Sequence, residues 1–211
     1  MLNRFSLSTF GNEDAVFMVN TIDYYNRNVQ NFIDGTVSVD FTQIQNVFLK
    51  LLPKNACILD FGCGSGRDTK YFLDCGHQVD AIDGSAELCR AASKYVGIEV
   101  KQMFFHELDE VEKYDGIWAC ASILHVKKAE LPDIIHKMSL AAKKNGIIYI
   151  SFKYGDFEGE RNGRYFTDMT ERSMKELLEN FPELNVEKQW ITGDVRPGRG
   201  DERWLNIILR K

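Results

Sequence analysis

The sequence predicts an α/β fold in which helices cover both faces of a mostly parallel sheet, so that the domain has three layers. Two observations support this. Short apolar runs of strand length recur between Cys57 and Leu209, and they alternate with segments whose apolar residues have helical spacing. The last two runs are joined without a helix between them. We therefore expect seven strands, all parallel except one antiparallel strand at the edge.

Length, composition and charge indicate which broad class of protein this is. The chain has 211 residues, 44% of them apolar, and a formal net charge of −5. This is enough chain for one domain with a substantial core, and the acidic balance argues against non-specific nucleic-acid binding. The five cysteines match no zinc spacing, so we expect no metal and reduced thiols. With no membrane-length apolar run and no secretory segment at the start, we expect a cytoplasmic protein that contacts no membrane.

The elements divide the chain into two parts, although we expect one compact domain overall. Residues 1–39 are expected to form a helical extension of one or two helices, with Gly35 as a turn, whereas residues 40–211 carry the regular alternation. The apolar periods of that second part predict strands at 57–61, 78–82, 98–102, 114–120, 146–152, 185–191 and 204–209. They predict helices at 40–52, 69–74, 85–95 and 129–144, and another that begins at Thr170. Residues 153–167 are expected to be a polar loop.

A glycine-rich turn follows the first strand. Gly62, Gly64 and Gly66 have no Cβ, so the backbone can approach a ligand closely, and Cys63 stands where a small side chain is needed. The first amides of the next helix then point unpaired N–H groups at that ligand. The run lacks the Gly-Lys-Ser/Thr ending of a P-loop, and its G-x-G-x-G spacing differs from the G-x-G-x-x-G of a dinucleotide fold.

An acid stands at the end of the second strand. Asp83 is followed by Gly84 and by Ser85, which can cap the next helix. A carboxylate in this place can accept hydrogen bonds from both ribose hydroxyls of an adenosine, and such charge-assisted bonds contribute roughly 1.5–3 kcal/mol each.

Residues 58–72, 81–85 and 114–125 together resemble class I S-adenosylmethionine-dependent methyltransferases, in motif order and spacing from Leu51 to the C-terminus. Bacterial small-molecule methyltransferases, including the tellurite-resistance type, are the nearest resemblance. It implies a Rossmann-like fold, S-adenosylmethionine as cofactor and S-adenosylhomocysteine as product. The cofactor-binding residues that it implies are Asp60, Gly62, Cys63, Gly64, Gly66, Asp83, Gly84, Ser85, Phe104, Phe105, Ala119 and Ser122.

Two of these assignments have a plain alternative. The class often places an acid after the third strand to bind the adenine amino group, and none stands there in this chain. The adenine would then be held by main-chain groups and by stacking on Phe104 or Phe105, or one or both of these rings belong to the core. His125, after the central strand, is a candidate general base because an imidazole titrates near neutral pH. The alternative is that His125 is structural and only shapes the pocket.

Two groups of residues are candidates for binding the acceptor. Extensions like residues 1–39 often fold over the cofactor in this class, so Tyr24 and Tyr25 are expected to line the site or else to pack on the domain surface. Four arginines lie in segments that follow the fifth and sixth strands, namely Arg161, Arg164, Arg196 and Arg199. Their guanidinium groups can bind a small anionic acceptor, or they form surface ion pairs with neighbouring acids.

The sequence therefore predicts a methyltransferase that acts on a small-molecule acceptor, as a monomer or a homodimer. The alternatives are an RNA or protein methyltransferase and a non-catalytic cofactor-binding protein. An NAD-dependent oxidoreductase would need the other glycine spacing.

Overall fold

The computed structural model describes residues 12–196 and 198–211, with side chains from residue 20 onward. A seven-stranded sheet forms its centre, in the order β3-β2-β1-β4-β5-β9-β8. The strands along the chain are β1 Cys57–Phe61, β2 Gln78–Asp83, β3 Val100–Gln102, β4 Tyr114–Ala119, β5 Ala142–Lys153, β8 Asn185–Gly193 and β9 Arg203–Arg210. Strands β1 to β5 are parallel, and β9 is antiparallel to both β5 and β8. The mostly parallel seven-stranded sheet is thus confirmed, and its antiparallel strand lies one position in from the edge.

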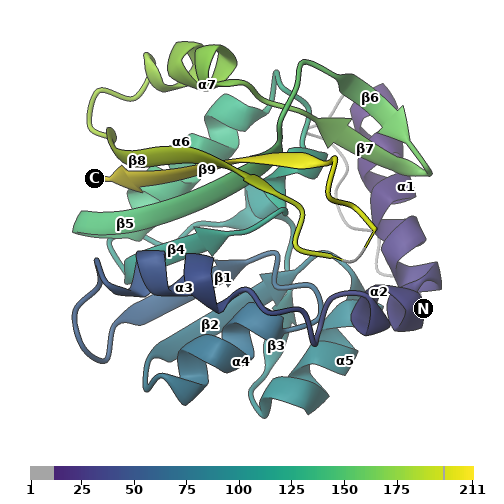
Figure 1. The fold of residues 1–211 in the computed structure, drawn as a ribbon, viewed down its shortest axis with the longest axis horizontal. Coiled ribbons are helices and arrows are strands. Elements are labelled where there is room, and N and C mark those ends of the chain that lie inside the picture. Colours follow the sequence, from purple (N-terminus) through teal and green to yellow (C-terminus); the bar gives the residue numbers. More distant parts are fainter. Residues whose placement is uncertain (1–11, 197) are drawn as a thin grey trace.

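Helices cover both faces of the sheet, which confirms the three layers (Figure 1). On one face lie α3 Thr42–Leu49, α4 Arg67–Asp74 and α5 Ala86–Val96, and on the other lie α6 Leu131–Ala141 and α7 Glu171–Leu178. Neighbouring strand residues serve opposite faces, because Ile58 belongs to the core beneath α3 and α4 while Leu59 belongs to the larger core beneath α6 and α7. Both faces of the sheet are therefore buried.

The N-terminal part forms α1 Asn12–Arg27 and α2 Val29–Asp34, and Gly35 caps the end of α2. These helices lie at one end of the sheet, beside α5 and the strand β7 Arg164–Thr167 (Figure 1). Hydrogen bonds help to hold α1 there. The Tyr165 amide donates to Thr21 Oγ1 at 3.0 Å, and Ser85 Oγ donates to Asn26 Oδ1 at 2.7 Å. Residues 1–11 of the predicted extension lie outside the described residues.

The expectation of a loop over residues 153–167 is wrong. This segment contains a β-hairpin, formed by β6 Glu158–Arg161 and β7 Arg164–Thr167. Its turn is Asn162-Gly163, with φ of +53° and +75°. Positive φ at both central residues defines the two-residue turn that matches the twist of a hairpin, and Asn-Gly is its strongest sequence signal. The hairpin carries two of the four predicted arginines.

Candidate functional site

The glycine turn follows β1 and lies against β2 and β4. The amides of Gly62 and Cys63 both donate to the Ile82 carbonyl, at 3.0 and 2.9 Å. At Gly62, φ is +90° and an added Cβ would lie 2.5 Å from Ser122 Cβ, so only glycine fits. Gly66 has a different task, since an added Cβ there would lie 2.8 Å from Val96 Cγ1 on α5. Gly62 and Gly64 border the cavities described below, whereas Gly66 brings two helices together.

Asp83 ties this turn to the start of α5. Its Oδ2 accepts a hydrogen bond from the Gly64 amide at 2.9 Å, and its Oδ1 accepts one from the Ser85 amide at 2.8 Å. Burial raises the pKa of this carboxyl, while the two amide bonds oppose that rise. Ser85 is itself buried and caps α5 by accepting from the Leu88 amide at 3.2 Å. Asp83 therefore faces a cavity, and Ser85 supports the helix behind it.

A small cavity of about 90 Å³ lies beside Asp83. Gly84, Phe104, Phe105 and Ser122 also line it, together with Ile22 of α1 and Phe32 of α2. The ring of Phe105 packs on Phe61 at 4.7 Å between centroids, and that of Phe104 stacks on His106 at 5.7 Å. Both phenylalanines thus face the cavity, and Phe105 is also continuous with the core.

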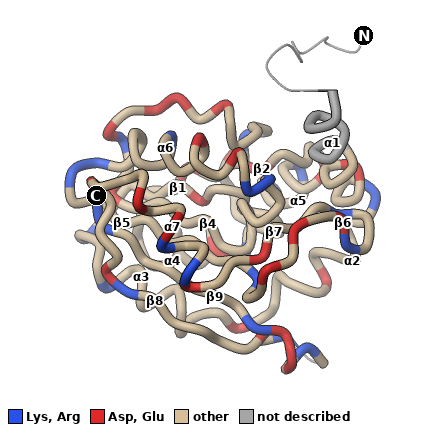
Figure 2. Tube along the Cα trace, turned by 90° about the horizontal axis from the view of Figure 1, so that it is seen from above, with Lys and Arg blue, Asp and Glu red and all other residues tan. Residues whose placement is uncertain are grey.

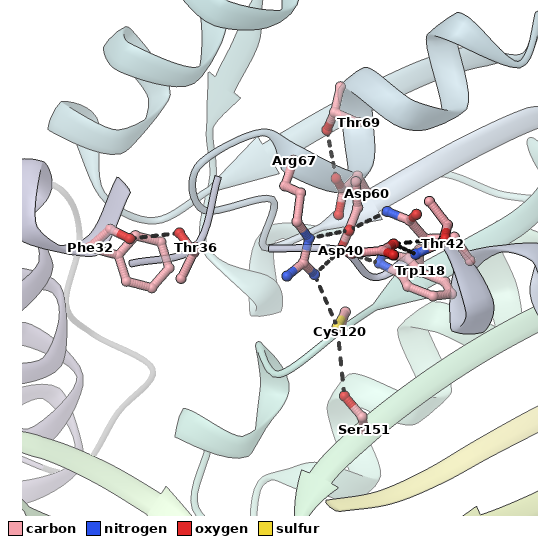
Figure 3. Close-up of polar contacts among 12 residues, drawn as sticks. Phe32, Thr36, Asp40, Thr42, Asp60, Arg67, Thr69, Trp118, Cys120 and Ser151 are labelled. Carbon is pink, nitrogen blue, oxygen red and sulfur yellow. Dashed lines mark hydrogen bonds and ion pairs between the residues drawn. The ribbon is translucent and has the colours of Figure 1, made fainter. Parts of the chain in front are cut away.

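Two predicted cofactor residues lie behind the cavity walls. The buried Asp60 accepts a hydrogen bond from Thr69 Oγ1 at 2.5 Å (Figure 3). Burial, and next the negative charge of Asp68, raise the pKa of the Asp60 carboxyl to about 8. Ala119 is fully buried in the core within β4, and the cavities are reached instead by Ala121 and Ser122, which follow that strand.

A larger cavity of about 650 Å³ opens on the other side of the glycine turn. Its walls come from five places: the N-terminal part of the chain between Tyr25 and Phe41, the turn itself, the segments at the ends of β4 and β5, the β6–β7 hairpin, and the segment that joins β8 to β9. Because the carboxyl ends of parallel strands meet at one edge, the fold brings segments distant in sequence to the same space. Tyr25 and His125 line both cavities.

His125 is held through both ring nitrogens. Nδ1 lies 2.6 Å from the Tyr165 carbonyl oxygen, which can only accept, so Nδ1 carries the proton. Nε2 therefore accepts a hydrogen bond from the Tyr25 hydroxyl at 2.8 Å. Burial, together with the smaller effect of the nearby positive charge of Arg164, lowers the pKa of His125 to about 4, although the hydrogen bond to the Tyr165 carbonyl opposes the shift. In this arrangement the imidazole is neutral at physiological pH, and the lone pair on Nε2 accepts the hydrogen bond from Tyr25.

Tyr24 and Tyr25 lie in different surroundings. Tyr25 points to the cavities, but Tyr24 packs outside them against the hairpin, where its ring lies 4.6 Å from the Arg164 guanidinium carbon. Tyr25 thus lies where the first expectation, lining the site, would place it, and Tyr24 lies where the second, packing outside the site, would place it.

All four predicted arginines line the larger cavity. Three of them form ion pairs: Arg161 with Asp168 at 2.7 Å, Arg196 with Asp194, and Arg199 with Glu202 at 3.7 Å. Arg164 has no ion pair with a carboxylate in the described part of the chain. The cluster is thus partly an ion-pair network and partly a source of uncompensated positive charge.

Sequence reasoning missed Arg67, the first residue of α4. Its Nε and Nη2 donate to the two oxygens of Asp68 at 2.7 and 2.9 Å, and its guanidinium lies 4.4 Å from the ring centroid of Phe41. From there Arg67 points toward Cys120 and Ser151 at the cavity floor (Figure 3). A basic residue directly after the third glycine was the available signal. Nothing in the local sequence marked Ile22 or Phe32.

Known proteins share this fold and these motifs. A family model described as a methyltransferase domain matches residues 58–146. The Xenopus laevis protein named N-terminal Xaa-Pro-Lys N-methyltransferase 1-A is 30% identical over 161 residues, which cover 65% of this chain and 71% of that protein. A solved structure of the Burkholderia thailandensis 1,6-didemethyltoxoflavin-N1-methyltransferase superposes with a TM-score of 0.76 at 21% identity, over 94% of this chain and 90% of that one. This chain belongs to the class I S-adenosylmethionine-dependent methyltransferases.

Membership in this class gives the methyltransferase its cofactor, S-adenosylmethionine. The Burkholderia structure contains S-adenosylhomocysteine together with 1,6-didemethyltoxoflavin. Against the Xenopus laevis 1-B protein, 35% identical over 104 residues, the match covers 47% of that protein, so it spans about half of its length. No helix in the described ranges is long and apolar enough to cross a membrane.

Proposed function

We propose that this methyltransferase transfers the methyl group to a small anionic acceptor bound in the larger cavity. The observation that carries the proposal is the charge of the cavity lining. Six cationic side chains line it, namely Arg67, Lys153, Arg161, Arg164, Arg196 and Arg199, against the three carboxylates Asp68, Asp194 and Glu202. The chain as a whole carries a net charge of −5, and basic and acidic residues are mixed along the described trace (Figure 2). The positive excess is therefore local to the cavity, where it attracts anions.

The residues present fit the cofactor. Gly62 and Gly64 let the backbone border both cavities, and each oxygen of Asp83 still has a lone pair for a ribose hydroxyl. Arg67, fixed by Asp68, would meet the carboxylate of the methionine part, and Asp60 would support the turn from behind. The bound cofactor supplies an activated methyl group, so the task of this chain is to position an acceptor atom in line with it at roughly 3–3.5 Å.

We assign α1 and α2 as a lid over the cofactor site. Ile22 and Phe32 pack where a Cβ would stand on Gly84 and Gly64, at 2.6 and 3.0 Å. The space they leave, about 90 Å³, is below the ~300 Å³ at which ligand pockets begin. These helices must therefore shift outward to admit an adenosine. Amide hydrogen exchange in α1 and α2 should slow when S-adenosylmethionine binds, and unchanged exchange would refute the lid.

An anionic acceptor also agrees with the state of His125. A neutral imidazole whose pKa is about 4 has little tendency to take up a proton. An acceptor atom that is already deprotonated needs no base, so His125 would act by orienting Tyr25, which corresponds to the structural alternative stated for it from the sequence rather than to the general base. Tyr25 is the more direct contact, because its hydroxyl borders both cavities.

The relatives suggest two kinds of acceptor. The Burkholderia protein's structure holds a small molecule, whereas the Xenopus laevis protein is named for protein N-termini of the sequence Xaa-Pro-Lys. Such a peptide presents two positive charges, on its amino terminus and its lysine, to a cavity whose lining is already positive. The charge of the cavity therefore favours a small anion over this peptide.

Methyl transfer from labelled S-adenosylmethionine tests the proposal. A panel of organic acids, the matching amides and amines, and an Xaa-Pro-Lys peptide would be compared as acceptors. We expect acids to be methylated, and we expect the double variant Arg196→Glu with Arg199→Glu to raise KM for them while cofactor affinity stays unchanged. Methylation confined to amines or the peptide would refute the anionic acceptor, and cofactor binding with no transfer would favour a non-catalytic role.

A further inference from the structure

We propose that Arg164 binds the anionic group of the acceptor, and that the acceptor is a flat monoanion of the aromatic carboxylate type. This inference rests on the proposed function and names the substrate class and the residue that selects it. Arg164 begins β7, on the wall of the larger cavity.

The first argument is the charge balance of the cavity. Arg67, Arg161 and Arg196 are each neutralised by one carboxylate, from Asp68, Asp168 and Asp194 in that order. Lys153 and Arg199 share a single carboxylate, that of Glu202. Arg164 alone among these six cations forms no ion pair with a described carboxylate, so a ligand carboxylate has no internal competitor there.

The second argument is how Arg164 is held. Its guanidinium carbon lies 4.6 Å from the ring centroid of Tyr24, 5.1 Å from that of Phe166 and 5.8 Å from that of Tyr25. Its Nη1 makes one long hydrogen bond, 3.4 Å, to the Tyr25 hydroxyl. Its Nε is buried and has no acceptor among the described residues. Aromatic rings thus fix the guanidinium while most of its five N–H donors stay available.

The third argument concerns the shape and charge of the ligand. The guanidinium of Arg164 balances one negative charge of a ligand, and its planar fork matches a carboxylate through two parallel hydrogen bonds. Phe41, Phe166 and Trp204 also line the cavity, so aromatic side chains form part of the wall that a flat ligand would contact. A carboxylate on an aromatic ring combines these properties.

The binding has a consequence at His125. The positive charge of Arg164 is one of the causes that lower the pKa of His125. A carboxylate placed on Arg164 would offset that charge, so the pKa of His125 should rise when the anion binds. A neutral ligand of the same shape would not produce this shift.

Benzoate and benzamide, titrated in the presence of saturating S-adenosylhomocysteine, test the proposal by calorimetry. Benzoate should bind the wild type at least about tenfold more tightly than benzamide. Arg164→Gln should weaken benzoate binding by about 10- to 100-fold, the range for a lost charge-assisted pair. Arg164→Lys should recover part of the loss, because it restores the charge without the fork. Arg90→Gln removes the same charge from an exposed ion pair on α5, outside the lining of the cavity, and should change affinity by less than about threefold.

Two controls keep the result interpretable. Unchanged affinity for S-adenosylhomocysteine would show that each variant is folded. Proton NMR of His125 in the wild type should show its pKa rising with benzoate and not with benzamide, which needs no variant. Equal binding of the two probes, or equal losses in Arg164→Gln and Arg90→Gln, would overturn the inference and leave the methyltransferase assignment standing. Failure of the wild type to bind S-adenosylhomocysteine would overturn both.

Discussion

Replacing Gly62 with alanine should destabilise the protein through two separable effects. The backbone there has a φ of +90°, a left-handed conformation that costs an L-residue about 1–2 kcal/mol. The new Cβ would also lie 2.5 Å from Ser122 Cβ, an atom fixed to its own backbone, and overpacking of this kind costs about 1–3 kcal/mol. The reduced freedom of the unfolded chain returns about 0.4–1 kcal/mol. The expected loss is therefore about 3 kcal/mol, within a range of about 1–5.

Two glycines of the same chain separate these effects. Gly76 has a φ of +86° with open space around it, so Gly76→Ala measures the backbone effect alone. Gly84 has no left-handed φ, and its Cβ would meet the terminal carbon of Ile22, which can swing aside, and the edge of the Phe104 ring at 3.3 Å, which needs to give by only a few tenths of an ångström. We expect losses of about 1 kcal/mol for Gly76→Ala and close to zero for Gly84→Ala.

Thermal unfolding followed by circular dichroism provides the assay. At about 2–4 °C per kcal/mol for a domain of this size, Gly62→Ala should lower Tm by about 6–12 °C and Gly76→Ala by about 2–4 °C. A Gly62→Ala variant that melts no lower than Gly76→Ala would show that the turn can move away from Ser122. The close approach of the turn to the end of β4 would then not be a requirement of the fold.

Three further predictions concern the carboxylates and His125. Asp83→Ala should weaken S-adenosylmethionine binding by about tenfold or more in calorimetry, and equal affinities would remove Asp83 from the cofactor site. Because the pKa of His125 falls from 6.5 unfolded to about 4 folded, the unfolded state takes up the proton first on acidification. His125 therefore contributes stability above pH 6.5 that is lost as pH falls toward 4, by about 3 kcal/mol, and denaturant titrations of His125→Gln should lack this loss. Asp60 has the opposite sign, since its folded pKa is raised to about 8, so Asp60→Asn should gain Tm relative to the wild type as pH rises from 4 to 8. A constant difference across that range would contradict the buried, protonated carboxyl.

Local patterns explain why much of the fold could be predicted. Ser85 and Thr170 cap α5 and α7 as expected, because a capping side chain bonds to amides within its own turn. The glycine turn follows β1 and Asp83 ends β2, as the apolar runs of the sequence predicted. The hairpin β6–β7 was missed although Asn162-Gly163 indicates its turn, because its strands are only four residues long and β6 contains no apolar side chain.

The site was predicted less completely, because its chemistry depends on partners distant in the chain. Tyr25 and His125 are 100 residues apart, and no spacing rule connects them. All four arginines have acids close to them in sequence, including Glu160 and Asp168 four positions to either side of Arg164, yet among the four only Arg164 lacks a described carboxylate partner. Sequence patterns indicate which residues share an edge of the sheet, but not how their charges are paired.

Tyr25 forms part of the wall of both cavities, and through its hydroxyl it joins His125 to Arg164. Two ligands that press on one movable side chain cannot bind independently. The free-energy change of moving the Tyr25 ring when one ligand binds alters the affinity for the other ligand. Thermodynamic linkage makes this effect equal in both directions. On the proposed assignment of the cavities to cofactor and acceptor, the shared tyrosine would therefore couple the two affinities without any contact between the two ligands.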